Sequence, residues 1–422
     1  MNPTPRVALL LSVATAVAAC GPVADAEWAG SVVDSAGVRI VRNPVVPEWT
    51  PEEGWWVEEA LRIQGDGVVP ETLFGYVVDA ARGPDGRIYV LDQQARAIRV
   101  FGPDGGFLST LAGPGEGPGE LGTVPTSMDL LGDTLVVTDW SQGRMNRYLP
   151  DGTVLSAPEL PDPLRRRSWL RAADGALWVR TLTYADDGDG RGWRAQDRLY
   201  RWEGELEEAL AFSYEPSDVG ARGSPRLPLI VNAPMWTVLP GGRVAWSDLA
   251  SAEIRIVDPR QDGARLRSVI RSDAWRARSP SGPDLAALRI LVGERLEMLG
   301  GDAATVDQIP VVDPPVLPVL TDLAAGPDGT LWAQRAGDLR AAHPMALNTP
   351  DPPRGWGGAT WDVLDRDGRY LGAVEMPPRF RMMALGDDWI LGVQADPRNV
   401  DAVALLLLHR GEEAAGAGGG TN

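Results

Sequence analysis

The sequence predicts an all-β fold: a six-bladed β-propeller in which a strand from the N-terminus closes the last blade and one short helix is inserted. Three observations predict it. A strand-and-turn unit recurs six times, and two of the intervals between its copies match the length of one four-stranded blade. The last copy is one strand short, while the N-terminal segment offers strands without a partner nearby.

The recurring unit consists of a turn, an apolar strand, a polar turn, a second strand and an Asp-Gly turn. Its clearest copy has turns at residues 83–86 and 103–105 and strands at residues 88–92 and 98–101. Short runs rich in β-branched and aromatic residues between turn formers are typical of strands. An Asp-Gly pair fits a tight reversal because glycine accepts a positive φ without a Cβ clash. The unit is therefore a set of hairpins.

The spacing of the copies indicates how many blades there are. Equivalent positions, at residues 92, 139, 181, 248, 335 and 393, are separated by 47, 42, 67, 87 and 58 residues. The first two intervals match the roughly 40–50 residues of one four-stranded blade. The three longer intervals contain the same unit with insertions. Six copies therefore predict six blades.

The chain ends indicate how the ring closes. Copy six ends near His409 and is followed by a glycine- and alanine-rich tail, so its outermost strand is missing. Residues 38–41 and 56–63 are the two N-terminal candidates for that strand. A strand from the other chain end would remove an exposed edge. The sequence leaves open which candidate does so.

The first thirty residues indicate export. Arg6 precedes thirteen apolar or small residues, 7–19, and then comes Cys20, the only cysteine. One positive charge and a short apolar core form a secretory signal, too short for a membrane span. Residues 17–20 resemble the bacterial lipoprotein signal, in which the cysteine is acylated, and Gly21 resembles the outer-membrane sorting pattern. The alternative is a plain signal with an incidental cysteine.

These features divide the chain into four parts. We expect a lipoprotein signal peptide at 1–19, a lipidated tether at 20–35, the six-bladed propeller at 36–410 and a disordered tail at 411–422. The lipoprotein signal implies an exported protein, anchored to a membrane through Cys20. The expected location is the outer membrane, facing the periplasm or the cell surface.

Two stretches resemble a known family. Residues 101–108 and 113–121, which lead from the first copy into the second, resemble bacterial six-bladed propellers related to NHL-repeat proteins. That family is widespread among secreted and lipid-anchored envelope proteins, and most of its members have no assigned activity. The resemblance therefore implies the fold and the envelope location and leaves the ligand open.

The composition excludes several classes of function. The 40 basic side chains, all arginine, face 58 acidic ones, which gives a net charge of −18. An acidic chain without a basic block is a poor nucleic-acid binder, because phosphate neutralisation supplies most of that affinity. The absence of lysine excludes lysine Schiff bases and the P-loop lysine. With two histidines, the chain cannot form a three-histidine metal site.

The long insertions are expected on one face of the propeller. Turns between the second and third strands and connections between blades emerge on the same face, and the insertions at 184–197, 213–234, 271–318 and 336–358 all fall there. Residues 283–299 of the third insertion have apolar side chains near helical spacing, which predicts a helix over this face or at its rim. Loops on one face of a repeat protein often build a binding surface.

Aromatic and arginine side chains in these turns are the candidate binding residues. Exposed tryptophans stack on sugars or anchor a partner, and guanidinium groups bind carboxylates or phosphates bidentately. The candidates are Arg96, Trp140, Arg144, Arg165, Arg166, Arg167, Trp193, Arg194 and Trp356.

We therefore expect a binding or scaffold module without a cofactor, which recognises a partner protein or an envelope glycan through its elaborated face. The alternative is a metal-dependent hydrolase or lactonase with calcium or another divalent metal held by carboxylates and asparagines in the central channel. Asp92, Asp139 and Asp248, which end equivalent strands, are weak candidates for such a metal site. No catalytic residue stands out.

Overall fold

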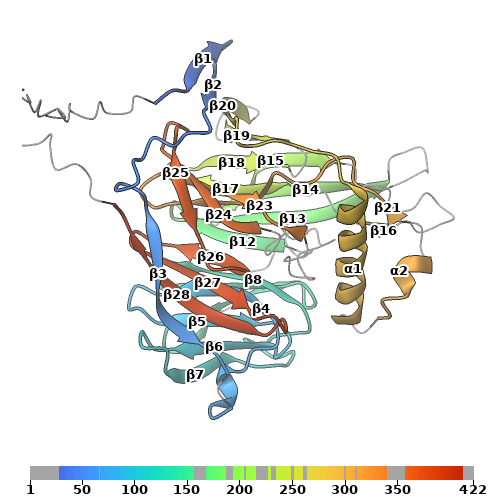
Figure 1. Ribbon diagram of the computed structural model, residues 1–422. Helices are drawn as coiled ribbons and strands as arrows, with labels where there is room; N and C mark the ends of the chain where they lie inside the picture. The colour runs from blue at the N-terminus through green and yellow to red at the C-terminus, as the bar shows by residue number, and fades with distance from the viewer. Residues whose placement is uncertain are drawn as a thin grey trace, which may run out of the picture.

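The described chain forms six antiparallel four-stranded sheets arranged as a six-bladed β-propeller (Figure 1). This computed structural model describes residues 28–65, 67–155, 168–186, 193–203, 206–214, 227–229, 234–248, 251–259, 264–298, 301–308, 311–339 and 357–411. The first strand of each blade is innermost. These strands contact one another in succession from β4 through β8, β12 and β17 to β22, and β26 contacts β4. The predicted fold class is confirmed.

The strands follow one another in blade order along the chain. Blade one has β4 (Val77–Arg82), β5 (Ile88–Asp92), β6 (Ala97–Phe101) and β7 (Phe107–Ala112). Blade two has β8 (Pro125–Leu131), β9 (Thr134–Asp139), β10 (Arg144–Tyr148) and β11 (Val154–Leu155). Blade three has β12 (Ser168–Ala173), β13 (Ala176–Asp186), β14 (Trp193–Trp202) and β15 (Leu206–Tyr214).

The second half of the chain builds the other three blades. Blade four has β17 (Met235–Leu239), β18 (Arg243–Ser247), β19 (Glu253–Asp258) and β20 (Arg265–Ser272), and it is extended by β2 (Val38–Asn43) and β1 (Ser31–Ser35). Blade five has β22 (Leu320–Ala325), β23 (Leu331–Ala336), β24 (Gly357–Leu364) and β25 (Tyr370–Glu375). Blade six has β26 (Phe380–Leu385), β27 (Trp389–Ala395), β28 (Asp401–His409) and β3 (Trp56–Ile63).

The ring is closed by chain from both ends. β3 pairs antiparallel with β28, from Val403 opposite Ile63 to His409 opposite Trp56. The candidate at residues 56–63 is therefore the closing strand, and it supplies the strand that copy six lacks. Ile63 is 2% exposed and packs among apolar side chains of both blade six and blade one, so the seam shares one core with its neighbour.

The N-terminal segment crosses the outside of three blades. The other candidate, at residues 38–41, lies in β2, which pairs in parallel with β20 of blade four. Residues 31–35, the end of the expected tether, form β1 on its far side. In blade five, the Asn43 side-chain amide donates to the Gly368 carbonyl at 2.9 Å, and the Trp49 N–H donates to the Leu371 carbonyl at 2.8 Å. β3 then joins blade six.

The Asp-Gly turns fold as the sequence predicts. In the turn after β4, the Gly83 N–H donates to the Arg87 carbonyl at 2.8 Å, and the Asp85 carboxylate accepts the Arg87 N–H at 3.1 Å. Gly86 has a φ of 83°, a left-handed conformation in which a Cβ would be strained. The turn is therefore fixed by one carboxylate and one glycine.

The predicted helical insertion is α1 (Gly282–Met298). Its N-terminus is capped reciprocally, because the Ser281 N–H donates to the Asp284 carboxylate at 2.8 Å while the Ser281 hydroxyl accepts the Asp284 N–H at 3.4 Å. Leu288 and Val292 are buried against blades four and five. The helix thus docks at the rim.

Smaller elements lie outside the blades. They are η1 (Pro70–Thr72), α2 (Thr305–Gln308), β16 (Leu227–Pro228) and β21 (Val311–Val312), the last two paired in parallel. Within the part of the chain that the structure describes, no helix has the length and apolar character needed to cross a membrane.

We expect Ile63→Ala to lower the free energy of unfolding by about 3 kcal/mol, because it leaves a cavity in the core shared by blades six and one. Leu407→Ala is the control, since Leu407 lies in the paired strand β28 but is 39% exposed. Chemical denaturation measures both variants. Equal losses would show that closure does not depend on this seam core.

Candidate functional site

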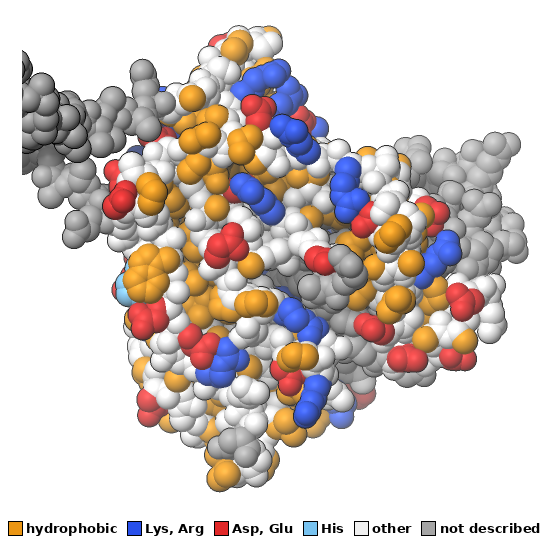
Figure 2. Space-filling model, viewed as in Figure 1, with side chains coloured by type: hydrophobic (Ala, Val, Ile, Leu, Met, Phe, Trp, Pro, Cys, Tyr) orange, Lys and Arg blue, Asp and Glu red, His pale blue; other side chains and the backbone are white. Residues whose placement is uncertain are grey.

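The two faces of the ring differ. Turns between first and second strands and between third and fourth strands are tight, as at residues 83–87, 102–106, 326–330 and 365–369, and form what we call the tight-turn face. The opposite, elaborated face carries the second-to-third turns and the connections between blades, including α1 and α2 (Figure 1). Figure 2 shows acidic and arginine side chains interspersed over the side of the molecule that includes the helices.

The three aspartates predicted as weak metal candidates bind backbone N–H groups: Asp92 and Asp139 end β5 and β9, and Asp248 directly follows β18. Asp92 accepts the N–H groups of Gly75, Tyr76 and Ala95 at 2.9–3.2 Å. Asp139 accepts the Gly122 N–H at 2.6 Å. Asp248 likewise accepts the N–H of a residue in its following turn. Each carboxylate organises the turn next to it.

Two of the predicted arginines lie in turns of the elaborated face. Arg96 has a φ of 51° in the turn after β5. The Arg144 guanidinium donates to the carbonyls of Glu116, Gly117 and Glu120 at 2.6–3.1 Å and so fixes the glycine-rich stretch at 113–121. Arg144 therefore supports a loop with its donors.

The predicted tryptophans are only partly described. Trp140 follows β9 on the elaborated face and is 46% exposed. Trp193 and Arg194 differ from the expected long turn: β13 and β14 extend their pairing, so these residues begin β14 opposite Asp186 and Ala185. Arg165, Arg166, Arg167, Trp356 and Cys20 lie outside the described residues.

A cavity of about 310 Å³ opens on the elaborated face between blades four and five. Trp275, Arg276, Arg278 and Arg335 line it from the ends of β20 and β23. Arg335 donates two hydrogen bonds to Asp362, at 2.9 and 2.7 Å, and Arg278 is paired with an aspartate of α1. Arg276 is exposed, and its terminal nitrogens have no hydrogen-bond partner among the described residues.

A larger cavity of about 450 Å³, which we call the axial chamber, lies where the innermost strands reach the tight-turn face. Asp79 of β4, Asp129 of β8, Arg171 of β12 and Asp322 of β22 line it. Asp79 is 1% exposed and lies 3.6 Å from the Arg171 guanidinium. The chamber is therefore lined by these three carboxyl groups and one guanidinium, together with exposed Asp174 of the turn after β12.

The chamber aspartates also join neighbouring blades. The second carboxylate oxygen of Asp79 accepts the Met128 N–H at 3.1 Å, and that of Asp129 accepts the Ala172 N–H at 2.8 Å. Asp322 accepts only the N–H of its neighbour Leu323, at 2.9 Å, among the described residues. Its second oxygen accepts no hydrogen bond from them.

The sequence analysis missed this chamber, although a signal exists. Asp79 and Asp322 are both the third residue of an innermost strand, in otherwise apolar surroundings. In both strands the pairing register shifts just before the aspartate, and β8 and β26 show similar shifts. Bulges of this kind redirect side chains and are common beside functional sites. An acidic residue repeated at the same position of the innermost strands is the pattern that would have indicated these two aspartates.

Burial dominates the electrostatics of the chamber. It raises the pKa of Asp79, Asp129 and Asp322 to about 6 each, and the nearby Arg171 guanidinium acts in the opposite direction on all three. The charge of Asp79 raises the pKa of Asp129 further. Negative charge is therefore poorly compensated in this cavity.

The chamber acids do not match a metal site. In the described ranges, no three His, Cys, Asp or Glu side chains come together so as to hold a metal ion. The oxygens of Asp79 and Asp129 are already engaged by backbone N–H groups. No reaction step is assigned to a metal here.

Comparisons with known proteins identify the architecture. No family model and no curated protein matches the chain. Among solved structures, a member of the DUF4221 family from Bacteroides vulgatus covers 85% of this chain and 99% of its own, at 10% identity and a TM-score of 0.51.

Two further solved structures are less similar. A calcium-binding protein, regucalcin, from Agrobacterium tumefaciens covers 84% of this chain and 96% of its own, at 13% identity and a TM-score of 0.42. A gluconolactonase from Xanthomonas campestris covers 80% and 87%, at 14% identity and a TM-score of 0.40.

What is shared is the fold. At 10% identity the DUF4221 structure supports the fold and nothing about ligand or reaction.

We expect Asp322→Asn to raise the free energy of unfolding at pH 7 by about 1 kcal/mol. A carboxyl group whose pKa is raised to about 6 binds its proton more tightly in the folded state, so its ionisation destabilises the fold as pH rises from about 4 to about 6. At pH 4 the variant and the wild type are expected to be equally stable.

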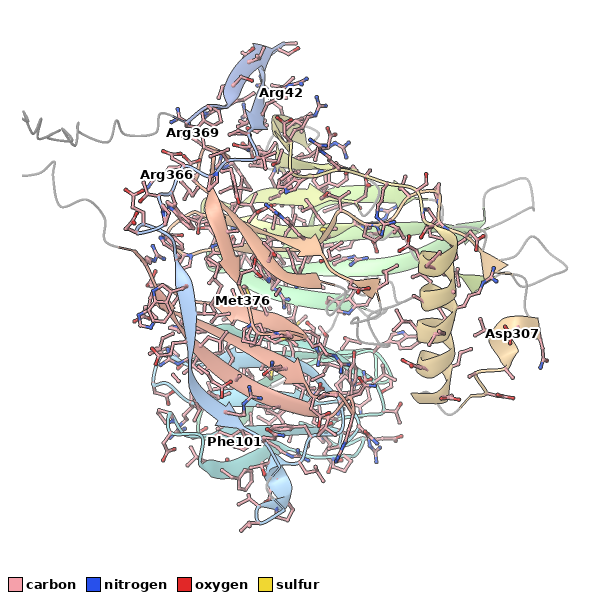
Figure 3. All side chains as sticks on the ribbon, in the orientation of Figure 1. Arg42, Phe101, Asp307, Arg366, Arg369 and Met376 are labelled. Carbon is pink, nitrogen blue, oxygen red and sulfur yellow. The ribbon has the colours of Figure 1, made fainter. Side chains whose placement is uncertain are left out.

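Denaturation at both pH values measures this difference. Asp307→Asn is the matched control, because Asp307 is exposed on α2 (Figure 3). A loss of stability in Asp322→Asn at pH 7 would contradict the assignment of an uncompensated charge.

Proposed function

We propose that the protein is an exported lipoprotein, anchored through Cys20, whose propeller binds a partner protein or an envelope glycan through the elaborated face. The signal-like residues 1–19 and the resemblance to NHL-repeat envelope proteins support the anchor. Residues 20–30 would then act as the tether, and the outer membrane is the proposed location. The binding role rests on the geometry of the described part.

The observation that carries this proposal is the position of the N-terminal strands, which lie apart from the elaborated face. The N-terminal strands β1 and β2 lie at the outer edge of blade four, apart from α1 and α2 on the elaborated face (Figure 1). Trp28, which precedes β1, lies 5.1 Å from the guanidinium of Arg369 in a turn of the tight-turn face. A lipid anchor preceding β1 would therefore leave the elaborated face pointing away from the membrane. Only that face combines long connections with an opening between blades.

The cavity between blades four and five gives this face a chemical preference. Arg335 and Arg278 are held by Asp362 and Asp284, while exposed Arg276 donates only through Nε, at 3.1 Å, to the Asp273 carbonyl. A guanidinium with free terminal nitrogens can donate two parallel hydrogen bonds to a carboxylate or phosphate. Trp275 is buried and donates to Asp362 at 2.7 Å, which makes the cavity floor rigid. An acidic group of the partner fits this position.

Replacing Cys20 by serine should release the protein from membranes, because the acyl chains that supply most of the membrane affinity are no longer attached. Fractionation of cells into membrane and soluble parts measures the change, and an unaltered propeller spectrum by circular dichroism is the control. Continued membrane association would disprove the anchoring proposal.

Arg276→Glu should weaken binding to an acidic envelope glycan or acidic partner by about tenfold or more, because a cation at the cavity becomes an anion. Equilibrium binding to purified acidic and neutral envelope glycans, together with cross-linking of envelope proteins in cells, measures it. Arg366→Glu is the matched control, since Arg366 is exposed in the turn before β25, away from α1 (Figure 3).

Two results would count against the elaborated face. One is equal capture by both charge-reversed variants. The other is loss of capture in Arg366→Glu alone, which would place the partner on the tight-turn face.

A further inference from the structure

The axial chamber is chemically distinct from the elaborated face. It lies at the opposite end of the innermost strands and is bounded by the turns that follow β12, β17 and β22. Its volume of about 450 Å³ is within the range of roughly 300–1,000 Å³ typical of small-molecule pockets. The chamber therefore has room for a small ligand that the elaborated face does not bind.

The charges in the chamber do not balance. Asp79, Asp129 and Asp322 face a single cation, Arg171, whose guanidinium nitrogen is 3.6 Å from Asp79 and also donates to the Leu170 carbonyl at 3.3 Å. With these three acids ionised, the inner part of the chamber holds two excess negative charges, to which exposed Asp174 at the turn after β12 adds a third. An ordinary structural network would be expected to pair them, because uncompensated buried charge is costly.

Two polar groups lining the chamber have unused hydrogen-bonding capacity. The second oxygen of Asp322 accepts no hydrogen bond from described residues. Trp361 also lines the chamber, is 0% exposed, and its indole N–H has no hydrogen-bond partner in the described part of the chain. Buried tryptophan N–H groups usually find an acceptor. The chamber thus offers one anionic acceptor to a ligand, beside a buried N–H group without an acceptor among the described residues.

We propose that the axial chamber binds a small organic amine that also carries hydroxyl groups, such as an amino sugar. Its ammonium group would pair with Asp322, in the negative surroundings of Asp79 and Asp129, and its oxygens would accept hydrogen bonds from Arg171. Burial raises the pKa of each aspartate, which means that the ionised carboxylates are disfavoured and that a bound cation would stabilise them. The proposal is independent of the partner bound by the elaborated face.

The test is calorimetric titration of the full-length protein with glucosamine and ethanolamine at pH 7 and pH 5. N-acetylglucosamine is the neutral control, because it keeps the sugar ring and loses the positive charge. We expect both amines to bind at pH 7, the acetylated sugar to bind at least about tenfold more weakly, and the amines to bind more weakly at pH 5, where the acids are protonated.

Asp322→Asn locates the binding. It should weaken amine binding by about tenfold or more, while Asp307→Asn, with the same charge change on exposed α2, should leave it unaltered. The proposal is overturned if neither amine binds at millimolar concentration, if the neutral sugar binds equally well, or if Asp322→Asn binds like the wild type. Calcium binding that depends on Asp322, without amine binding, would likewise overturn it and indicate a metal site.

Discussion

The antiparallel pairing of β3 with β28 is the constraint on which the rest of the structure depends. Each blade is a separate sheet that buries its faces largely against its two neighbours, as at the contacts of blade six with blades one and five. Without β3, blade six would end in an unpaired β28, and Ile63 would be missing from the core shared with blade one. The cavity between blades four and five and the axial chamber both require blades held at fixed angles, so both follow from this closure.

The sequence predicted those features that are decided locally. Asp-Gly turns, short strands and their spacing determine six blades because each depends on neighbouring residues, as in the turn at 83–87. The missing last strand limited the closing strand to two candidates. The choice between them could not be predicted, because both are short β-prone runs. Their partners, β20 and β28, lie more than two hundred residues further along the chain.

The functional residues were harder to predict. Arg144 was a candidate for ligand binding, but its donors serve backbone carbonyls of a loop that a single sequence does not place beside it. Asp79 and Asp322 seemed to be ordinary members of apolar strands, because a register shift that turns a side chain toward the axis leaves little trace in the hydrophobic pattern. Even the cavity that contains Arg276 depends on three connections meeting in space.

The N-terminal segment runs along the outer rim of three blades. It pairs with blade four through β2, contacts blade five through Asn43 and Trp49, and joins blade six as β3. This route has a mechanical consequence. Tension applied at the start of the chain reaches the antiparallel β1–β2 hairpin first and then the parallel pairing of β2 with β20, where five residue positions share the load in shear. The blade-five contacts come next. The seam is thus shielded from pulling, because tension at the N-terminal end of the chain would strain the rim before it could open the ring.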